Sequence, residues 1–210
     1  MPVTWESERC CACWGVNNFV HMEIHSGIQK VVYFLFGTNF VIGRQIKSQI
    51  RWLNEQVPPE FKGRKLDDLG CGDGKITVRL KQVFEPASLR GFDVNLGLVM
   101  RARMRGIEAE TLDLDARLPS GELAVMWGVL HHLKDKEACL KRISQNYRLA
   151  FIREPLKNRA IDGLEMGKPL IKSEIEALAR KYFPGARILY NGHCIFIFYV
   201  EPGYSAAAST

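Results

Sequence analysis

The stretch Leu66-Asp67-Asp68-Leu69-Gly70-Cys71-Gly72-Asp73-Gly74-Lys75 decides the fold of this chain. We predict a short strand at residues 65–69 and a helix at residues 75–84. Between them, three glycines let the backbone turn sharply and approach a ligand closely. The first turn of the helix presents unpaired N–H groups to such a ligand. The segment therefore predicts a ligand-binding turn where a buried strand ends.

Strands and helices alternate on the carboxyl side of this turn. We predict strands at residues 88–93, 109–114, 122–128 and 147–153, and helices at residues 96–105, 136–145 and 172–182. This alternation implies a mostly parallel sheet covered by helices on both faces, which is a doubly wound α/β fold.

The two ends of the chain depart from that rhythm. Strands at 186–190 and 194–200 flank Asn191-Gly192, a pair that favours an antiparallel hairpin because both central residues accept positive φ. A loop that extends to His193 leaves the turn type open. Before the first strand, residues 28–57 are predicted to be helical in two parts that divide after Gly43 and stop before Pro58.

Two familiar phosphate-binding turns fit the glycine segment poorly. A P-loop needs glycine at position 69 and Ser or Thr at position 76, where this chain has Leu69 and Ile76. The dinucleotide fingerprint, begun at Gly70, places its third glycine on Lys75. Both patterns fail at residues that their ligands require.

The pattern Asp-x-Gly-x-Gly-x-Gly from Asp68 to Gly74 resembles the first motif of class I S-adenosylmethionine-dependent methyltransferases, of the small-molecule, type 11/12-like group. Three similar motifs follow in the family's order. They are Gly91-Phe92-Asp93-Val94-Asn95, the acidic segment from Asp113 to Pro119, and the stretch from Leu123 to Leu133. Ile152-Arg153-Glu154-Pro155 resembles the end of the fifth strand. The resemblance covers about residues 64–200.

The resemblance implies a Rossmann-like, seven-stranded sheet whose last strand is antiparallel, with S-adenosylmethionine as cofactor. In the family, the acid that matches Asp93 holds the ribose hydroxyls. An acid that matches Asp113 or Asp115 meets the adenine amino group, and we slightly prefer Asp115. Asp68 is expected to attract the ammonium group. The residues assigned to the cofactor are Asp68, Gly70, Cys71, Gly72, Gly74, Asp93, Val94, Asp113, Asp115 and Gly128. Helix capping by Asp93 and solvation of the two later acids stay open as alternatives.

His131 and His132 are the candidate catalytic residues. They follow the fourth strand, where the acceptor pocket opens in such folds, and histidine is a common general base near neutral pH. The alternative is that these histidines only hydrogen-bond their own loop. After this strand, the chain lacks the Asn/Asp-Pro-Pro-aromatic motif of relatives that methylate exocyclic amines. It also contains neither a Pro-Cys nor a Thr-Cys pair, one of which would carry the cysteine nucleophile for cytosine C5 methylation.

These features favour methyl transfer to a small-molecule or lipid-like acceptor and do not favour nucleic acid. The rival hypothesis is a non-catalytic module that binds the cofactor or a protein on the same fold. The expected organisation is an N-terminal segment and helical lid at 1–57, a cofactor-binding domain at 58–202 and a disordered tail at 203–210. The apolar stretch 31–43 is too short to span a bilayer, so we consider peripheral membrane contact or packing on the core.

Composition adds weaker constraints. The chain has 210 residues, a net charge of +6 and Lys and Arg dispersed along its length, which favours a solvated basic surface. Six cysteines without a disulfide-like spacing suggest a reducing, cytoplasmic location, and the first residues do not resemble a secretory signal. Cys10, Cys11 and Cys13 with His21 and His25 have atypical spacing for zinc, so we predict no metal. The oligomeric state stays open.

Overall fold

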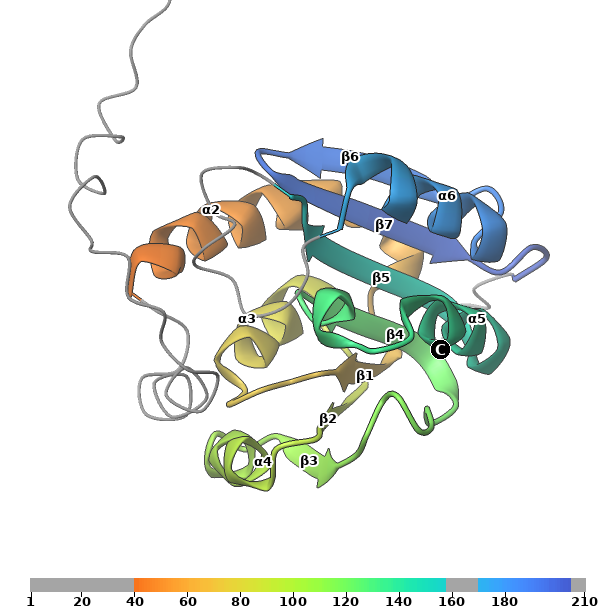
Figure 1. Cartoon of the computed structure of the whole chain (residues 1–210). Helices are drawn as coiled ribbons and strands as arrows, with labels where there is room; N and C mark the ends of the chain where they lie inside the picture. The colour runs from red at the N-terminus through yellow and green to blue at the C-terminus, as the bar shows by residue number, and fades with distance from the viewer. Residues whose placement is uncertain (1–39, 158–169, 205–210) are drawn as a thin grey trace, which may run out of the picture.

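Seven strands form one sheet in the computed structural model, which describes residues 40–157 and 170–204 (Figure 1). The strands are β1 (Lys65–Leu69), β2 (Ser88–Asp93), β3 (Glu108–Thr111), β4 (Gly121–Trp127), β5 (Tyr147–Pro155), β6 (Arg187–Asn191) and β7 (Cys194–Val200). Their order across the sheet is β3-β2-β1-β4-β5-β7-β6. The first five strands pair in parallel, whereas β7 is antiparallel to both β5 and β6. The predicted fold class, including its terminal hairpin, is confirmed.

Helices cover both faces of this sheet. They are α2 (Phe40–Gln56), α3 (Lys75–Phe84), α4 (Leu96–Met104), α5 (Lys136–Asn146) and α6 (Lys172–Tyr182), with single 3-10 turns η1 (Pro59–Phe61) and η2 (Leu130–His132). Helices α5 and α6 share one apolar cluster with the sheet, and α2 and α3 share another (Figure 1). Helix α4 packs beside β2 and β3 at the sheet edge.

Strand β7 shows how the sequence builds two apolar faces at once. Its residues alternate between the clusters: Ile195 and Ile197 face α5 and α6, while Phe196 and Phe198 face α2 and α3. Successive side chains of a strand point to opposite faces, so a strand covered on both sides needs apolar residues throughout. This requirement explains the unbroken apolar run at the end of the sheet.

The N-terminal helix differs from its prediction. Helix α2 runs through Gly43 without a break, so the predicted division after that residue is wrong. Ile46 and Leu53 lie in the same apolar cluster as α3, and Leu53 is fully buried. Burial of this face stabilises the helix enough to outweigh the cost of one glycine, about 1 kcal/mol. This part of the predicted lid therefore packs into the core of the domain.

Two other boundaries moved for local reasons. Strand β3 stops at Thr111 instead of residue 114 because Asp113 Oδ1 accepts a bond from the N–H of Asp115, 2.9 Å away, and turns the chain. In the hairpin, Asn191 pairs with Cys194, so the loop is Gly192-His193. Gly192 has φ +59°. A two-residue hairpin turn with glycine as its first central residue needs such a positive φ at that position.

Some predictions fall beyond the described residues. The Cys and His cluster at 10–25, the helix at 28–39 and the tail from 205 lie outside them. Gly203 and Tyr204, assigned to the tail, are described, and the Tyr204 hydroxyl donates to Glu122 at 2.7 Å. The described helices include none that is long and apolar enough to cross a membrane. Within the same ranges, no cluster of three or more potential metal ligands occurs.

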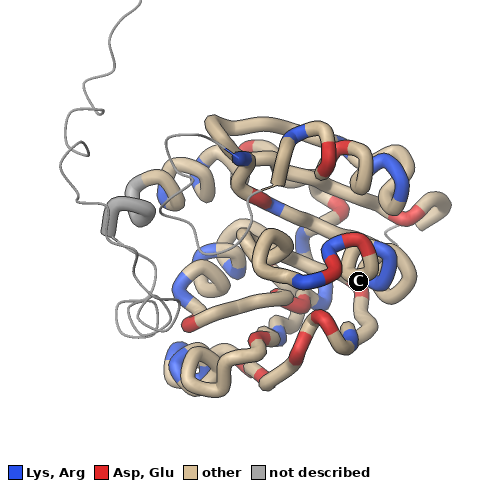
Figure 2. The backbone as a smooth tube through the Cα atoms, viewed as in Figure 1, with Lys and Arg blue, Asp and Glu red and all other residues tan. Residues whose placement is uncertain are grey.

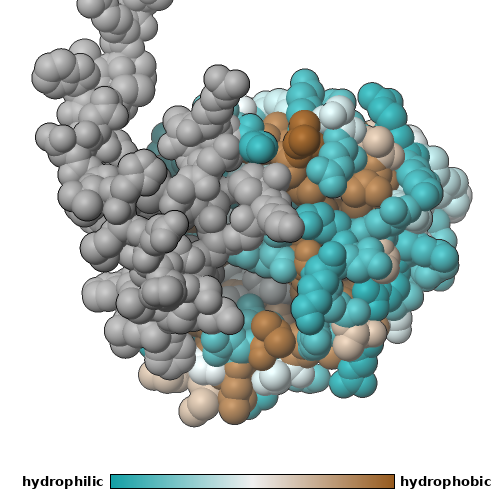
Figure 3. Space-filling view, in the orientation of Figure 1, coloured by the Kyte–Doolittle hydropathy of each residue, from teal (hydrophilic) through white to brown (hydrophobic). Residues whose placement is uncertain are grey.

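Two further views show where charged and apolar residues lie on the fold. Figure 2 shows Lys and Arg scattered over several helices and strands. In Figure 3, apolar side chains reach the surface near α4. Leu96 and Met100 lie on that surface, each more than half exposed, and Val94 just before the helix is 67% exposed. These residues lie next to the ends of β1 and β2, where the candidate site is found.

Candidate cofactor-binding site

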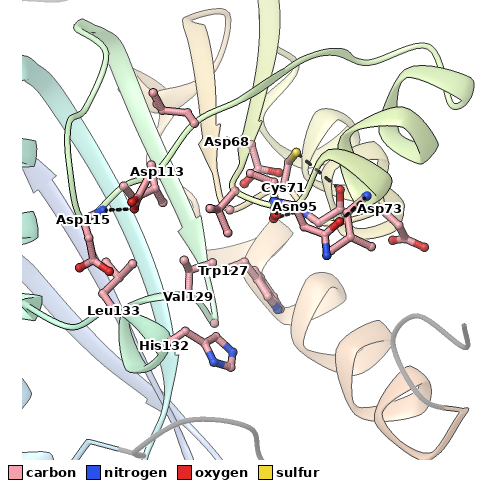
Figure 4. Close-up of a pocket in the computed structure, with 18 of the residues that line it drawn as sticks. Asp68, Cys71, Asp73, Asn95, Asp113, Asp115, Trp127, Val129, His132 and Leu133 are labelled. Atoms are coloured by element: carbon pink, nitrogen blue, oxygen red, sulfur yellow. Dashed lines mark hydrogen bonds between the residues drawn. The ribbon is translucent and has the colours of Figure 1, made fainter. Parts of the chain in front are cut away.

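A cavity of about 510 Å³ opens at the carboxyl ends of β1, β2 and β4 (Figure 4). This place is the topological switch point of the sheet, where β1 leads to β2 on one side and borders β4 on the other. The predicted cofactor-binding residues that line the cavity are Asp68, Gly70, Cys71, Gly72, Asp93, Val94, Asp113, Asp115 and Gly128. Gly74 does not line it. Of the two candidate catalytic residues, His132 lines the cavity and His131 does not.

The glycine turn is tied to the end of β2. The N–H groups of Gly70 and Cys71 both donate to the carbonyl oxygen of Phe92, at 2.7 and 2.9 Å. Gly70 has φ +88°, and a Cβ atom at this position would lie 2.3 Å from Val129 Cγ2. The absence of a side chain therefore lets the turn touch the loop that follows β4, which closes one wall of the cavity.

Gly74 has a different function from the other glycines. It has φ +80° and precedes the first residue of α3. A Cβ there would lie 2.5 Å from Ile107 Cδ1 and 3.2 Å from Ala102 Cβ. Gly74 thus permits close packing of the turn against α4 and the segment before β3. This packing, on the side of the turn away from the cavity, is its contribution to the site.

Asp68 is buried under the turn at the end of β1. It is 2% exposed, and its Oδ2 accepts a 2.6 Å hydrogen bond from the Thr77 hydroxyl. Burial raises the pKa of Asp68 to about 7, while the Thr77 hydrogen bond opposes the rise and the charge of Asp93 adds to it. A cationic group in the cavity would favour the ionised carboxylate. The site is therefore built to respond to positive charge near Asp68.

Asp93 is held in place by the backbone around it. Its Oδ2 accepts from the N–H of Gly72 and its Oδ1 from the N–H of Asn95, each at 2.9 Å. Burial raises its pKa, and these two hydrogen bonds oppose the rise. A carboxylate has about four lone-pair positions, so two remain for a diol. Asn95, which caps α4, leaves Asp93 without the capping role that the sequence kept open.

The structure separates the two acids after β3. Asp115 accepts bonds from the N–H groups of Lys134 and Asp135, with Oδ1 distances of 3.0 and 3.3 Å. It joins this loop to the loop that precedes α5. Asp113 is exposed, and its recorded partner is the N–H of Asp115. Its carboxylate is more available to a ligand than that of Asp115.

The two histidines also separate. His131 is 6% exposed, and its Nδ1 lies 2.7 Å from Glu154 Oε2. Glu154, which is fully buried, accepts with its other oxygen from the N–H groups of Val129 and Leu130, at 2.8 and 2.7 Å. The Glu154 carboxylate at the end of β5 therefore holds the loop after β4 in place. His131 contributes to this hydrogen-bond network instead of facing the cavity.

His132 faces the cavity beside its partner (Figure 4). The two imidazole centroids are 3.9 Å apart. Desolvation of the ring, with a further contribution from His131, lowers the pKa of His132 to about 4, although part of the residue reaches solvent. His132 is therefore neutral near pH 7 and can accept a hydrogen bond, but it is a weak base.

Sequence reasoning missed several parts of the site. Thr77 carries the hydroxyl that meets Asp68, and Glu154 fixes the loop, yet neither lies in a glycine or acidic motif. Trp127 and Asn95 line the cavity. A signal existed for Asn95, because Asn two residues after a strand-ending acid and directly before a helix is a typical cap. Thr77 and Glu154 are apparent only once the elements have packed.

Comparisons with known proteins agree with the geometry. Residues 68–148 match the family described as methyltransferase domain. Ribosomal RNA small subunit methyltransferase C of Hahella chejuensis is 38% identical over 74 residues, 35% of this chain and 21% of that protein. Trans-aconitate 2-methyltransferase of Mycolicibacterium gilvum is 33% identical over 81 residues, 38% of this chain and 32% of that protein. The chain therefore matches less than a third of the length of each of these two relatives.

Solved structures extend the similarity across the sheet. Magnesium protoporphyrin IX methyltransferase from Synechocystis PCC 6803, with bound SAH, superposes with a TM-score of 0.60 at 19% identity. The match covers 84% of this chain and 95% of that one. Residues 68–148 thus resemble a methyltransferase domain in sequence, and the sheet resembles the fold of solved S-adenosylmethionine-dependent methyltransferases.

Proposed function

We propose that this protein transfers a methyl group from S-adenosylmethionine to a small-molecule or lipid-like acceptor. The observation that carries the proposal is the convergence of the glycine turn, Asp68, Asp93 and Asp113 on one cavity at the switch point of the sheet. A volume of about 510 Å³ falls within the range of small-ligand sites.

The residues present fit this cofactor better than a phosphate-bearing one. Two buried or half-buried carboxylates, Asp68 and Asp93, border the glycine turn, and they would repel a phosphate. They suit an ammonium group and a ribose diol. Exposed Val94 and buried Leu112 offer apolar surface for the adenine ring, with Asp113 at its edge. The glycines permit close approach of the amino-acid part.

The chemistry of the bound cofactor is that of an activated methyl donor, whose sulfonium releases the methyl group to a nucleophile in line. The protein then supplies orientation and exclusion of water. The close approach of Gly70 to Val129, in the loop after β4, closes one wall of the cavity. His132 presents a neutral imidazole that accepts a hydrogen bond from the acceptor, and His131 positions the loop through Glu154.

Trp127 and His132 mark the acceptor end of the cavity in this proposal, since they lie away from Asn95 and Asp113 (Figure 4). A mostly apolar wall there supports an organic acceptor of modest size. Peripheral membrane contact stays a prediction, because the apolar stretch 31–43 lies largely outside the described residues. The cytoplasmic location also stays a prediction.

The decisive experiment is methyl transfer from radiolabelled S-adenosylmethionine into small-molecule and lipid fractions of an extract. The full chain should label at least one fraction, and Asp93→Ala should abolish most of that labelling. Labelling confined to nucleic acid would contradict the acceptor class. Tight cofactor binding without any labelling would instead favour the non-catalytic module.

A further inference from the structure

Arg153 lies near the carboxyl end of β5, two residues before Pro155, beside the acceptor end of the cavity. It pairs in register with Trp127 of β4, and its guanidinium carbon lies 5.2 Å from the centroid of the Trp127 ring. Its Nη1 atom lies 3.3 Å from the point that a Cβ on Gly128 would occupy. Trp127 and Gly128 both line the cavity. A guanidinium group is thus placed directly behind two residues of the cavity wall.

The recorded partners of Arg153 contain no carboxylate. Nε donates to Gln49 Oε1 at 3.2 Å, and Nη2 donates to Cys194 Sγ at 2.7 Å. Among residues 40–157 and 170–204, no Asp or Glu forms an ion pair with it. Arg90, by contrast, meets both oxygens of Asp67, at 2.8 and 2.7 Å.

A half-buried guanidinium without a carboxylate partner is energetically costly. Arg153 is half-buried, and a guanidinium does not lose its proton in proteins. A partly desolvated charge without a counter-ion raises the free energy of the folded state, and an anion that arrives there recovers part of it. Nearby Glu154 is not that anion, because its oxygens are engaged by Val129, Leu130 and His131.

Arg153 does not itself line the cavity, but Gly128, which does, borders its guanidinium. A side chain at position 128 would bring its Cβ to 3.3 Å from Nη1, so the glycine leaves this space open. Nη1 is also the terminal nitrogen for which the described residues provide no hydrogen-bond acceptor. Its position beside a glycine of the cavity wall therefore leaves room for an acceptor atom to approach it.

We propose that Arg153 binds a carboxylate of the methyl acceptor, so that the acceptor is an organic acid. The inference rests on the proposed function and names the substrate class of the same site. A carboxylate matches the single charge of one guanidinium and its planar donors. Trp127 offers an apolar face to the carbon skeleton next to the acid.

The test uses 4-fluorobenzoate and its neutral counterpart 4-fluorobenzamide as probes of the full chain, in the presence of S-adenosylhomocysteine. Fluorine NMR relaxation measures the affinity of each. Wild-type protein should bind the benzoate at least about tenfold more tightly than the benzamide, the ratio expected for one charge-assisted hydrogen bond. Arg153→Gln should reduce that ratio to about one, and Arg153→Lys should keep part of it because the charge remains.

Arg148→Gln is the matched control. Arg148 lies on the same strand but at its opposite, exposed end, near Glu201. This variant should keep the full preference for benzoate. Thermal unfolding and S-adenosylhomocysteine titration of each variant show whether it is folded.

Equal binding of the two probes by wild-type protein, or an undiminished preference in a folded Arg153→Gln variant, would overturn the inference. These outcomes are separate from failure of the proposed function. That failure would appear as absence of S-adenosylhomocysteine binding, or as absence of methyl transfer into small-molecule and lipid fractions, whatever the probes did.

Discussion

Replacing Asp68 with asparagine should change how the stability of the protein without cofactor depends on pH. The carboxyl group has a pKa of 3.8 in an unfolded chain and about 7 in the folded protein. Because the folded state binds this proton more tightly, the free energy of unfolding falls as the pH rises from about 4 to 7. The difference between the two pKa values corresponds to roughly 4 kcal/mol in total.

Most of that change falls in a range that can be measured. Between pH 5 and pH 8, ionisation of Asp68 should lower the free energy of unfolding by about 2–3 kcal/mol. Asp68→Asn has no proton to lose, so its stability relative to wild type should improve by that amount over the same range. Urea unfolding at the two pH values gives the comparison, in which other titrating groups largely cancel.

Thr77→Val serves as a variant of opposite sign. Loss of the hydroxyl that donates to Asp68 removes the bond that lowers the pKa of that carboxyl, so the fall in stability with pH should become steeper. Saturating S-adenosylhomocysteine should reduce the wild-type pH dependence, since its ammonium favours the ionised carboxylate. The reasoning is refuted if wild type and Asp68→Asn differ by the same amount at pH 5 and pH 8.

Three other changes test the site and its supports. Asp93→Ala should weaken cofactor binding by about 2–3 kcal/mol in a calorimetric titration, because it removes charge-assisted hydrogen bonds to the ribose; normal binding by a folded variant would exclude the ribose role. Gly70→Ala should destabilise the fold by more than about 1 kcal/mol in urea, since its Cβ would meet Val129 at a φ of +88°, and Gly70→Ala with Val129→Ala should recover only the steric part. Leu53→Ala should cost about 2–5 kcal/mol of unfolding free energy, as expected for a fully buried leucine; a negligible change would show that α2 is a detachable lid.

Local signals predicted most of the fold. The bounds of β1, α3, β2, α6 and β7 agree with the sequence because glycines, prolines and changes of apolar period mark each end. Gly43 misled the prediction because burial of Ile46 and Leu53 stabilises α2 more than one glycine weakens it. The early end of β3 depends on one hydrogen bond from Asp115 to Asp113, which no periodicity encodes.

The site was predictable where its chemistry is local and hidden where it is tertiary. The glycine turn and Asp93 were both assigned from local motifs, and the structure joins them through the N–H of Gly72, which donates to Asp93. The choice between Asp113 and Asp115 depended on which carboxylate accepts hydrogen bonds from the loop before α5. The different roles of His131 and His132 depended on Glu154, which comes from a distant strand and, of the two histidines, is hydrogen-bonded only to His131. Arg153 lies in the motif at the end of the fifth strand, but that motif gave no sign of a role for its side chain, because its contacts come from three separate elements.

Calorimetric titration of the full chain with S-adenosylmethionine, and separately with NADH, tests the central claim most directly. The cavity at the glycine turn should bind one equivalent of S-adenosylmethionine with a dissociation constant of about 1–100 μM. NADH should give no measurable heat, because Lys75 replaces the third glycine of its fingerprint and two carboxylates border the turn. Saturable binding of NADH, with none of S-adenosylmethionine at millimolar concentration, would contradict the account.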